Sequence, residues 1–143
     1  MLAIPLQIVS EENVLGSEYP IVLVVDDSTV CQNMIRKLLE KSKFRTDGAN
    51  NGLQAIAKVR DNPGKFDAIL MDIRMPLMNG IVATQTLRED YNYEGPIIAL
   101  SASTDVQIIY NIIAAGANEA ATKPLRYVQI LSLLAKYGVT VDD

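Results

Sequence analysis

The polar residues that interrupt the apolar runs of this chain belong to few types, and those types limit its chemistry. They lie at the ends of short predicted strands: Asp26, Asp27, Asp72, Ser101 and Lys123. The chain has no histidine and a single cysteine, Cys31, which excludes catalytic triads built on histidine, histidine zinc sites and an internal disulfide. Carboxylates, a lysine and a hydroxyl are the groups that remain for chemistry.

Three carboxylates gathered at one site repel one another. Two unit charges about 4 Å apart cost roughly 4 kcal/mol at an effective dielectric constant of about 20. A hard divalent cation relieves this repulsion, and Mg²⁺ suits one or two carboxylates plus waters better than Ca²⁺, which prefers a fuller protein cage. Lys123 is a compact charge suited to a phosphoryl oxygen, and Ser101 offers a hydroxyl. These groups predict a phosphoryl-handling site in which a carboxylate is the nucleophile.

The segments that carry these residues alternate between strand and helix patterns. Continuous apolar runs indicate strands that are buried on both faces, as in a parallel sheet. The predicted strands cover residues 21–25, 44–48, 68–71, 96–101 and 119–122, and the predicted helices cover 28–42, 53–61, 81–90, 104–115 and 127–137. Five alternating units require a parallel sheet with helices on both faces. The carboxyl ends of parallel strands share one edge, so the polar residues are expected to converge there.

Two of the predicted helices have informative patterns. In helix 28–42, Asp27 or Ser28 is expected to be the N-cap, and the apolar positions at helical spacing are Val30, Met34, Ile35, Leu38 and Leu39. Helix 104–115 is too apolar for a single buried face. At about 100° per residue, an inward stripe of Val106, Ile109 and Ile113 leaves Ile108 and Ile112 pointing elsewhere. Either neighbouring loops cover these two, or they form an exposed patch for a partner or a second copy.

Composition bounds the class of protein. The 143 residues are 49% hydrophobic and 21% charged, which is typical of a globular domain. The net charge of −4 argues against a broad nucleic-acid or anionic-membrane surface. There is no apolar run of about 20 residues and no signal-peptide pattern, and the lone cysteine favours a reducing compartment, so a cytoplasmic location is expected.

The expected organisation is one domain with two flanking segments. Residues 1–20 are predicted to be a linker or N-terminal arm, residues 21–138 the domain, and residues 139–143 a C-terminal tail. An alternative for the first segment is that Ile4, Leu6 and Ile8 form an extra strand or a short helix. No output domain follows residue 138 in this sequence, so the chain is interpreted either as a stand-alone protein or as a domain excised from a larger one.

Several motifs resemble those of the receiver domain of two-component response regulators and hybrid histidine kinases, over about residues 21–137. They are Val24-Val25-Asp26-Asp27-Ser28, Asn51-Gly52, the segment from Leu70 to Gly80, Leu100-Ser101-Ala102, the segment from Ala115 to Asn118, and Lys123-Pro124-Leu125. Within the third of these, Met-Asp-x-x-Met-Pro-x-Met-x-Gly is highly specific. The resemblance implies a flavodoxin-like α/β fold with a five-stranded parallel sheet in the order 2-1-3-4-5.

The resemblance also implies a role for each residue of the site. Asp72 would be the phosphoacceptor; Asp27, Asp72 and the carbonyl of Arg74 would ligate Mg²⁺, and Asp26 would act through water. Ser101 would move onto the phosphoryl group, Lys123 would pair with it, and a cis peptide would precede Pro124. The implied donor is a phosphohistidine on a histidine kinase or a histidine phosphotransfer protein. The domain would catalyse only its own phosphorylation and dephosphorylation, and contact neither nucleic acid nor membrane.

Two positions depart from the family pattern. Ala120 stands where the family commonly has Tyr or Phe, so the domain is predicted to signal without an aromatic switch or to use another ring, such as Tyr110 or Tyr127. Arg74 is unusually large for its position two residues after the acceptor, and it is expected to affect the lifetime of the phosphate. The alternative functions are a non-phosphorylated pseudo-receiver that acts as an interaction module, an aspartate-nucleophile phosphatase and a flavin carrier. The second acid expected of the phosphatase is missing, because Arg74 stands in its place. The aromatic and glycine-rich loops expected of the flavin carrier are missing as well.

Overall fold

The computed structural model describes residues 19–141 and contains five strands and five helices in strict alternation. The strands are β1 (Ile21–Val25), β2 (Arg45–Ala49), β3 (Ala68–Asp72), β4 (Ile97–Ser101) and β5 (Glu119–Thr122). The helices are α3 (Thr29–Lys41), α4 (Gly52–Asp61), α5 (Gly80–Glu89), α6 (Val106–Ala114) and α7 (Tyr127–Lys136). The expected arm, residues 1–20, lies outside the described residues except for Tyr19 and Pro20. None of the helices within 19–141 is long and apolar enough to span a membrane.

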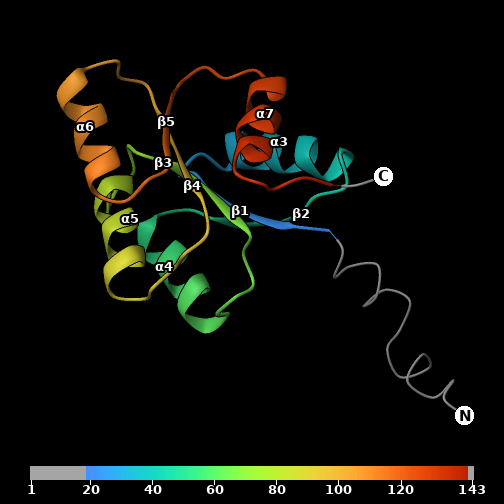
Figure 1. Ribbon diagram of the computed structural model, residues 1–143, viewed down its shortest axis with the longest axis horizontal. Coiled ribbons are helices and arrows are strands. Elements are labelled where there is room, and N and C mark those ends of the chain that lie inside the picture. Colours follow the sequence, from blue (N-terminus) through green and yellow to red (C-terminus); the bar gives the residue numbers. More distant parts are fainter. Residues whose placement is uncertain (1–18, 142–143) are drawn as a thin grey trace, which may run out of the picture.

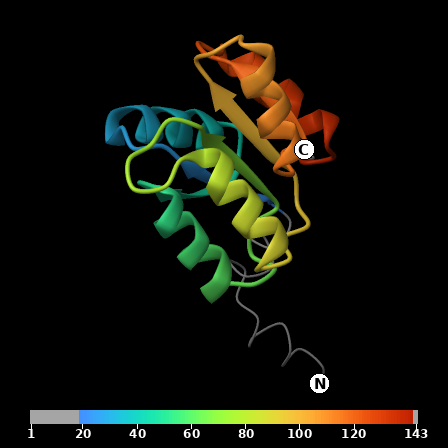
Figure 2. The same cartoon turned by 90° about the vertical axis from the view of Figure 1, so that its left-hand side faces the viewer.

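All strand pairs are parallel, and the sheet order is β2-β1-β3-β4-β5. The fold predicted from the sequence is therefore confirmed. Helices α3 and α7 cover one face of the sheet, and α4, α5 and α6 cover the other (Figure 1). Figure 2 shows α4 and α5 side by side on their face.

The two-layer cover explains why the central strands are apolar throughout. Successive strand residues point to opposite faces. Leu23 and Val25 of β1 belong to the core under α4, α5 and α6, whereas Val22 and Val24 belong to the core under α3 and α7. All five residues of β3 and all five of β4 are buried, including Asp72 and Ser101 at their carboxyl ends. A polar residue at either place therefore lies inside the protein at the end of its strand.

Side-chain caps fix where several helices begin. Ser28, one of the two expected caps, accepts a hydrogen bond from the backbone N–H of Cys31 at the start of α3. Asn51, Asn79 and Asp105 cap α4, α5 and α6 in the same way. Because each cap lies in the loop after a strand, the loops at the carboxyl edge are held by the helices that follow them.

The expected faces of α3 and α6 need correction. Val30 and Met34 of α3 are 77% and 55% exposed, and Gln32 is buried instead. In α6 the stripe is reversed, since Ile112 is buried and Ile108 packs on the core, whereas Val106 and Ile113 are exposed. Nearly every position of α6 is apolar, so the pattern alone did not determine which side meets α5 and β5.

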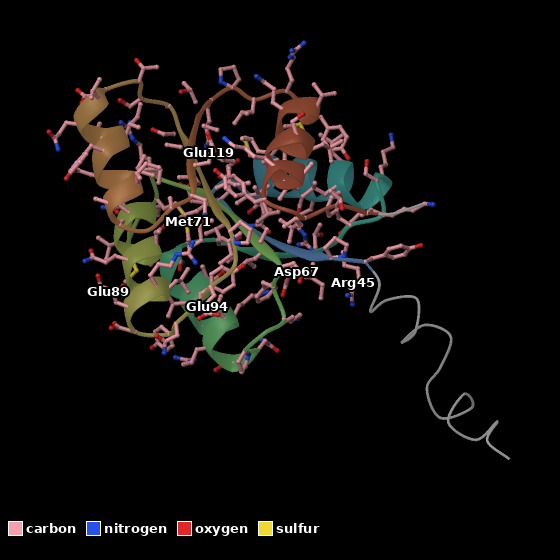
Figure 3. The ribbon with its side chains drawn as sticks, in the orientation of Figure 1. Arg45, Asp67, Met71, Glu89, Glu94 and Glu119 are labelled. Carbon is pink, nitrogen blue, oxygen red and sulfur yellow. The ribbon has the colours of Figure 1, made fainter. Side chains whose placement is uncertain are left out.

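At the amino edge of the sheet, hydrogen bonds hold the backbone just before and at the start of β1. The Arg45 guanidinium donates two hydrogen bonds to the carbonyl of Tyr19, and the Ile21 N–H donates to Asp67 at 2.8 Å. Figure 3 shows Arg45 and Asp67 at the start of β1. At the other end of the chain, Val139 is buried against the core under α3 and α7, and Val141 packs on it, so the first residues of the expected tail contact the domain.

Candidate functional site

Three carboxylates lie together at the carboxyl edge of the sheet. Asp26 and Asp27 directly follow β1, and Asp72 is the last residue of the adjacent strand β3. One carboxylate oxygen from each lies within 4.8 Å of the others. Asp26 and Asp72 are buried, whereas Asp27 is exposed. The strand order thus brings together acids that are 46 positions apart (72 − 26) in the sequence.

Lys123 supplies the positive charge at this edge. Its Nζ donates a hydrogen bond to Asp72 Oδ1 at 2.9 Å and lies 3.9 Å from Asp26 Oδ2. The Lys123 backbone is held as well, because its N–H donates to the carbonyl of Ser101 at 2.7 Å. The peptide bond between Lys123 and Pro124 is cis, as the resemblance implied. The hydrogen bond to Ser101, at the end of β4, therefore helps to place the Lys123 ammonium against the two carboxylates.

The two charges perturb each other. Burial raises the pKa of Asp72 above its ordinary value, the hydrogen bond from Lys123 offsets part of this, and the charges of Asp26 and Asp27 add to it. Burial works against the charge of Lys123, but its hydrogen bond to Asp72 and the nearby carboxylates raise its pKa overall. Lys123 therefore stays charged at neutral pH. The site stabilises the anion of Asp72 incompletely, which favours the binding of further positive charge.

A cleft of about 390 Å³ opens above these groups. Every candidate residue from the sequence lines it: Asp26, Asp27, Asp72, Arg74, Ser101 and Lys123. Arg74 is exposed at the cleft, and its side chain makes no hydrogen bond or ion pair with residues 19–141. Cys31 and Ile108 also line the cleft.

Ser101, at the carboxyl end of β4, is hydrogen-bonded to the loop that follows it. Its Oγ accepts a hydrogen bond from the Ser103 N–H at 3.1 Å and donates to the Ser103 carbonyl at 3.4 Å. The hydroxyl is thus bound to the loop between β4 and α6. To donate to a group placed on Asp72, the hydroxyl would have to give up the hydrogen bond that it donates to the Ser103 carbonyl.

Sequence reasoning gave no role to two residues beside the site. Gln32 is buried beneath the loop that carries Asp26, and it lies on the same helical face as Ile35 and Leu39, a spacing that points it inward. Gly80 at the start of α5 packs so closely that a Cβ there would lie 2.3 Å from the Asp72 carbonyl oxygen. The helical spacing is a signal for Gln32, whereas the close contact at Gly80 is visible only in three dimensions.

Comparison with known families agrees with the fold. The family described as response regulator receiver domain matches residues 22–135. The chain belongs to this family. Receiver domains occur both as parts of large kinases and as small regulators, and relatives of both kinds match this one.

The chain is 36% identical over 126 residues to hybrid signal transduction histidine kinase M of Dictyostelium discoideum, a match that covers 85% of the chain and 5% of the kinase. It is 38% identical over 120 residues to two-component response regulator 24 of Arabidopsis thaliana, covering 84% of the chain and 85% of that protein. The chain thus spans a small part of the kinase but most of the plant regulator.

A solved structure of the same fold is the receiver domain of the sensor histidine kinase PA1611 from Pseudomonas aeruginosa PAO1. It matches with a TM-score of 0.74 and 30% identity, covering 83% of the chain and 97% of that domain. That structure is described as having a magnesium ion coordinated in its active-site cleft.

Proposed function

We propose that this receiver domain accepts a phosphoryl group on Asp72 from a phosphohistidine of a histidine kinase or a histidine phosphotransfer protein. The observation that carries the proposal is the position of Lys123 Nζ, 2.9 Å from Asp72 Oδ1, within a cluster of three carboxylates. In the transfer, a carboxylate oxygen of Asp72 bonds to phosphorus as the phosphorus–nitrogen bond of the donor breaks. The imidazole of the donor leaves as a neutral ring with a proton on its other nitrogen.

The acidic cluster fits a magnesium ion. Its donors are hard carboxylate oxygens that lie within 4.8 Å of one another, and Mg²⁺ binds such groups together with water. Asp27, Asp72 and the carbonyl of Arg74 would hold the ion, with Asp26 contributing through water. When bound, Mg²⁺ neutralises charge that develops on the transferred oxygens. Lys123, which donates a hydrogen bond to Asp72 Oδ1, keeps that carboxylate in position and pairs with a phosphoryl oxygen.

Phosphorylation would change the conformation of the domain through Ser101 and Lys123. To shift a two-state equilibrium from 1:99 to 99:1 takes about 5.5 kcal/mol. Each new hydrogen bond to a charged oxygen contributes roughly 1.5–3 kcal/mol. The Ser101 hydroxyl must first give up the hydrogen bond that it donates to the Ser103 carbonyl. Full switching by these two bonds alone is therefore marginal, and a partner that binds the switched form completes it.

Incubation with a small phosphodonor and Mg²⁺ tests the proposal. The intact mass of the wild type is expected to increase by one phosphoryl group, and that of Asp72→Asn to stay unchanged, because an amide cannot form the acyl phosphate. Omitting Mg²⁺ should suppress the increase. A wild-type mass that does not change under any of these conditions would favour the pseudo-receiver, which keeps the fold and serves only as an interaction module.

Arg74→Ala is expected to shorten the lifetime of the phosphate several-fold. The long side chain of Arg74 lies exposed at the cleft with no partner among residues 19–141, so it is free to cover the phosphoryl group against water. Loss of the phosphorylated mass with time, in the presence of Mg²⁺, measures the rate. Arg60→Ala removes an arginine that pairs with Asp61 instead and serves as the control. Equal rates for wild type and Arg74→Ala would contradict the expectation.

The exposed apolar face of α6 supports a contact with a second copy or with a partner protein. Val106 is 80% exposed, Tyr110 is 66% exposed, and both lie on the same side as Ile113. We expect the phosphorylated domain to self-associate through this face and Val106→Asp to abolish the association. Sedimentation of both proteins over a range of concentrations measures it. A phosphorylated wild type that stays monomeric throughout would exclude the second copy.

A further inference from the structure

Gln32 is an unusual residue for the buried side of α3. It is 5% exposed, and the other fully buried residue of this helix, Leu39, is apolar. A buried amide that finds no partners is costly, so its hydrogen bonds indicate what it does. Gln32 lies one helical turn past the acidic pair, next to the loop that carries Asp26.

The side-chain amide of Gln32 joins two loops at the carboxyl edge. Its Nε2 lies 3.2 Å from the carbonyl of Asp26, 2.9 Å from the carbonyl of Ala49 and 2.8 Å from Asn50 Oδ1. The Asp26 N–H donates to the same Ala49 carbonyl at 3.1 Å. The backbone of Asp26 is thus tied on both sides, directly to Ala49 and through Gln32 to Asn50.

A glycine in the neighbouring strand makes room for this amide. Gly48 lies in β2, where a strand interior normally disfavours glycine. A Cβ at Gly48 would lie 1.8 Å from Gln32 Oε1 and 2.7 Å from Gln32 Cδ. Gly48 has ordinary strand pairing with Val24, so close approach of the amide, rather than backbone conformation, explains the glycine.

The tie acts on a residue whose carboxylate has two partners at the site. The carboxylate of Asp26 accepts from the Ser28 N–H at 2.9 Å through Oδ1 and faces Lys123 through Oδ2 at 3.9 Å. Both contacts depend on where the backbone of Asp26 lies. Without the amide of Gln32, that backbone keeps its link to Ala49 but loses the link to the loop before α4.

We propose that Gln32 is a positioning residue that holds the Asp26–Asp27 loop in place for the binding of the divalent cation. The inference rests on the proposed function, because it takes the acidic cluster to be a magnesium site. Groups that orient metal ligands without touching the metal typically contribute 10- to 100-fold to affinity. Gln32 bonds to the backbone of Asp26, one of the residues proposed to act on the ion. Removing its amide is therefore expected to lower the Mg²⁺ affinity about tenfold.

Gln32→Met tests the proposal, because methionine keeps the length of the side chain and removes the amide. Calorimetric titration with Mg²⁺ is expected to show about tenfold weaker binding. Gln107→Met is the matched control, since Gln107 is exposed and its side chain bonds, among residues 19–141, to Asn111 on its own helix. Gly48→Ala, which displaces the amide without removing it, should weaken Mg²⁺ binding in the same direction.

A second measurement needs no metal. In metal-free protein, exchange of the Asp26 backbone N–H is expected to be faster in Gln32→Met, while amides in the centre of β4 exchange as in the wild type. Unchanged Mg²⁺ affinity and unchanged Asp26 exchange in Gln32→Met would overturn the inference and leave the proposed function standing. A wild type that does not bind Mg²⁺ would instead remove the proposed function, and the role of Gln32 with it.

Discussion

Replacing Lys123 by methionine is expected to slow the phosphorylation of Asp72 by about a hundredfold or more. Methionine is similar in length but has no charge, so the variant removes the ammonium that lies 2.9 Å from Asp72 Oδ1 and 3.9 Å from Asp26 Oδ2. Phosphoryl transfer depends mainly on positioning and on neutralising the charge of the transferred oxygens. The initial rate of phosphoprotein formation from a small phosphodonor, measured with saturating Mg²⁺, gives the effect.

The loss of Lys123 is also expected to change the pKa of Asp72. The hydrogen bond from Lys123 lowers the pKa of Asp72, so in its absence burial and the neighbouring carboxylates raise that pKa further. The remaining activity of Lys123→Met should therefore improve as the pH is raised. Lys136→Met, which removes an exposed ammonium paired with Glu119, should leave the rate unchanged. Wild-type rates in Lys123→Met would disprove the role of the lysine.

The strand positions and the meeting of the acids could be predicted from the sequence for a physical reason. A strand covered on both faces has to be apolar along its length, so the point where the run stops is visible in the sequence. The runs before Asp26 and Asp72 end within one residue of the observed strand ends, 21–25 and 68–72. Once the strands are parallel, their ends must share an edge.

The helix faces could not be predicted equally well. An amphipathic pattern locates the buried face only when polar residues mark the other side. In α6, Gln107 and Asn111 mark a polar side, but the four isoleucines at positions 108, 109, 112 and 113 spread around the rest of the helix, so the pattern does not decide which of them is buried. The contacts with α5 and β5 decide that Ile112 is the buried residue.

The hydrogen bonds of the Ser101 hydroxyl could not be predicted from the sequence either. Its place at the end of β4 follows from the apolar run, but the direction of its hydroxyl depends on one loop. Ser103 lies in the loop before α6, which begins at Val106 and not at the predicted residue 104, and both its N–H and its carbonyl bond to the hydroxyl. The resemblance to receiver domains assigned Ser101 a role without indicating this hydrogen bond.

Gly80→Ala is expected to destabilise the protein by about 3 kcal/mol. Gly80 lies at the start of α5, and alanine has a higher helix propensity than glycine. Propensity alone would therefore predict that Gly80→Ala stabilises the helix. The packing reverses that expectation. A Cβ at Gly80 would lie 2.3 Å from the carbonyl oxygen of Asp72 and 2.9 Å from the Cα of Ile73, both of them backbone atoms that no side-chain rotation can move. Urea unfolding without metal measures the difference.

Gly64→Asn is the matched control for this variant. Gly64 has a φ of 79°, which asparagine tolerates better than most residues, and nothing lies within 4 Å of its missing Cβ. Its unfolding free energy should stay within about 0.5 kcal/mol of the wild type. The Gly80 N–H donates to the carbonyl of Ile73 at 2.8 Å, so any shift of α5 that accommodates alanine also moves the segment that follows Asp72. Gly80→Ala should therefore weaken Mg²⁺ binding as well, and a variant with wild-type stability and wild-type Mg²⁺ affinity would show that this contact does not hold the site.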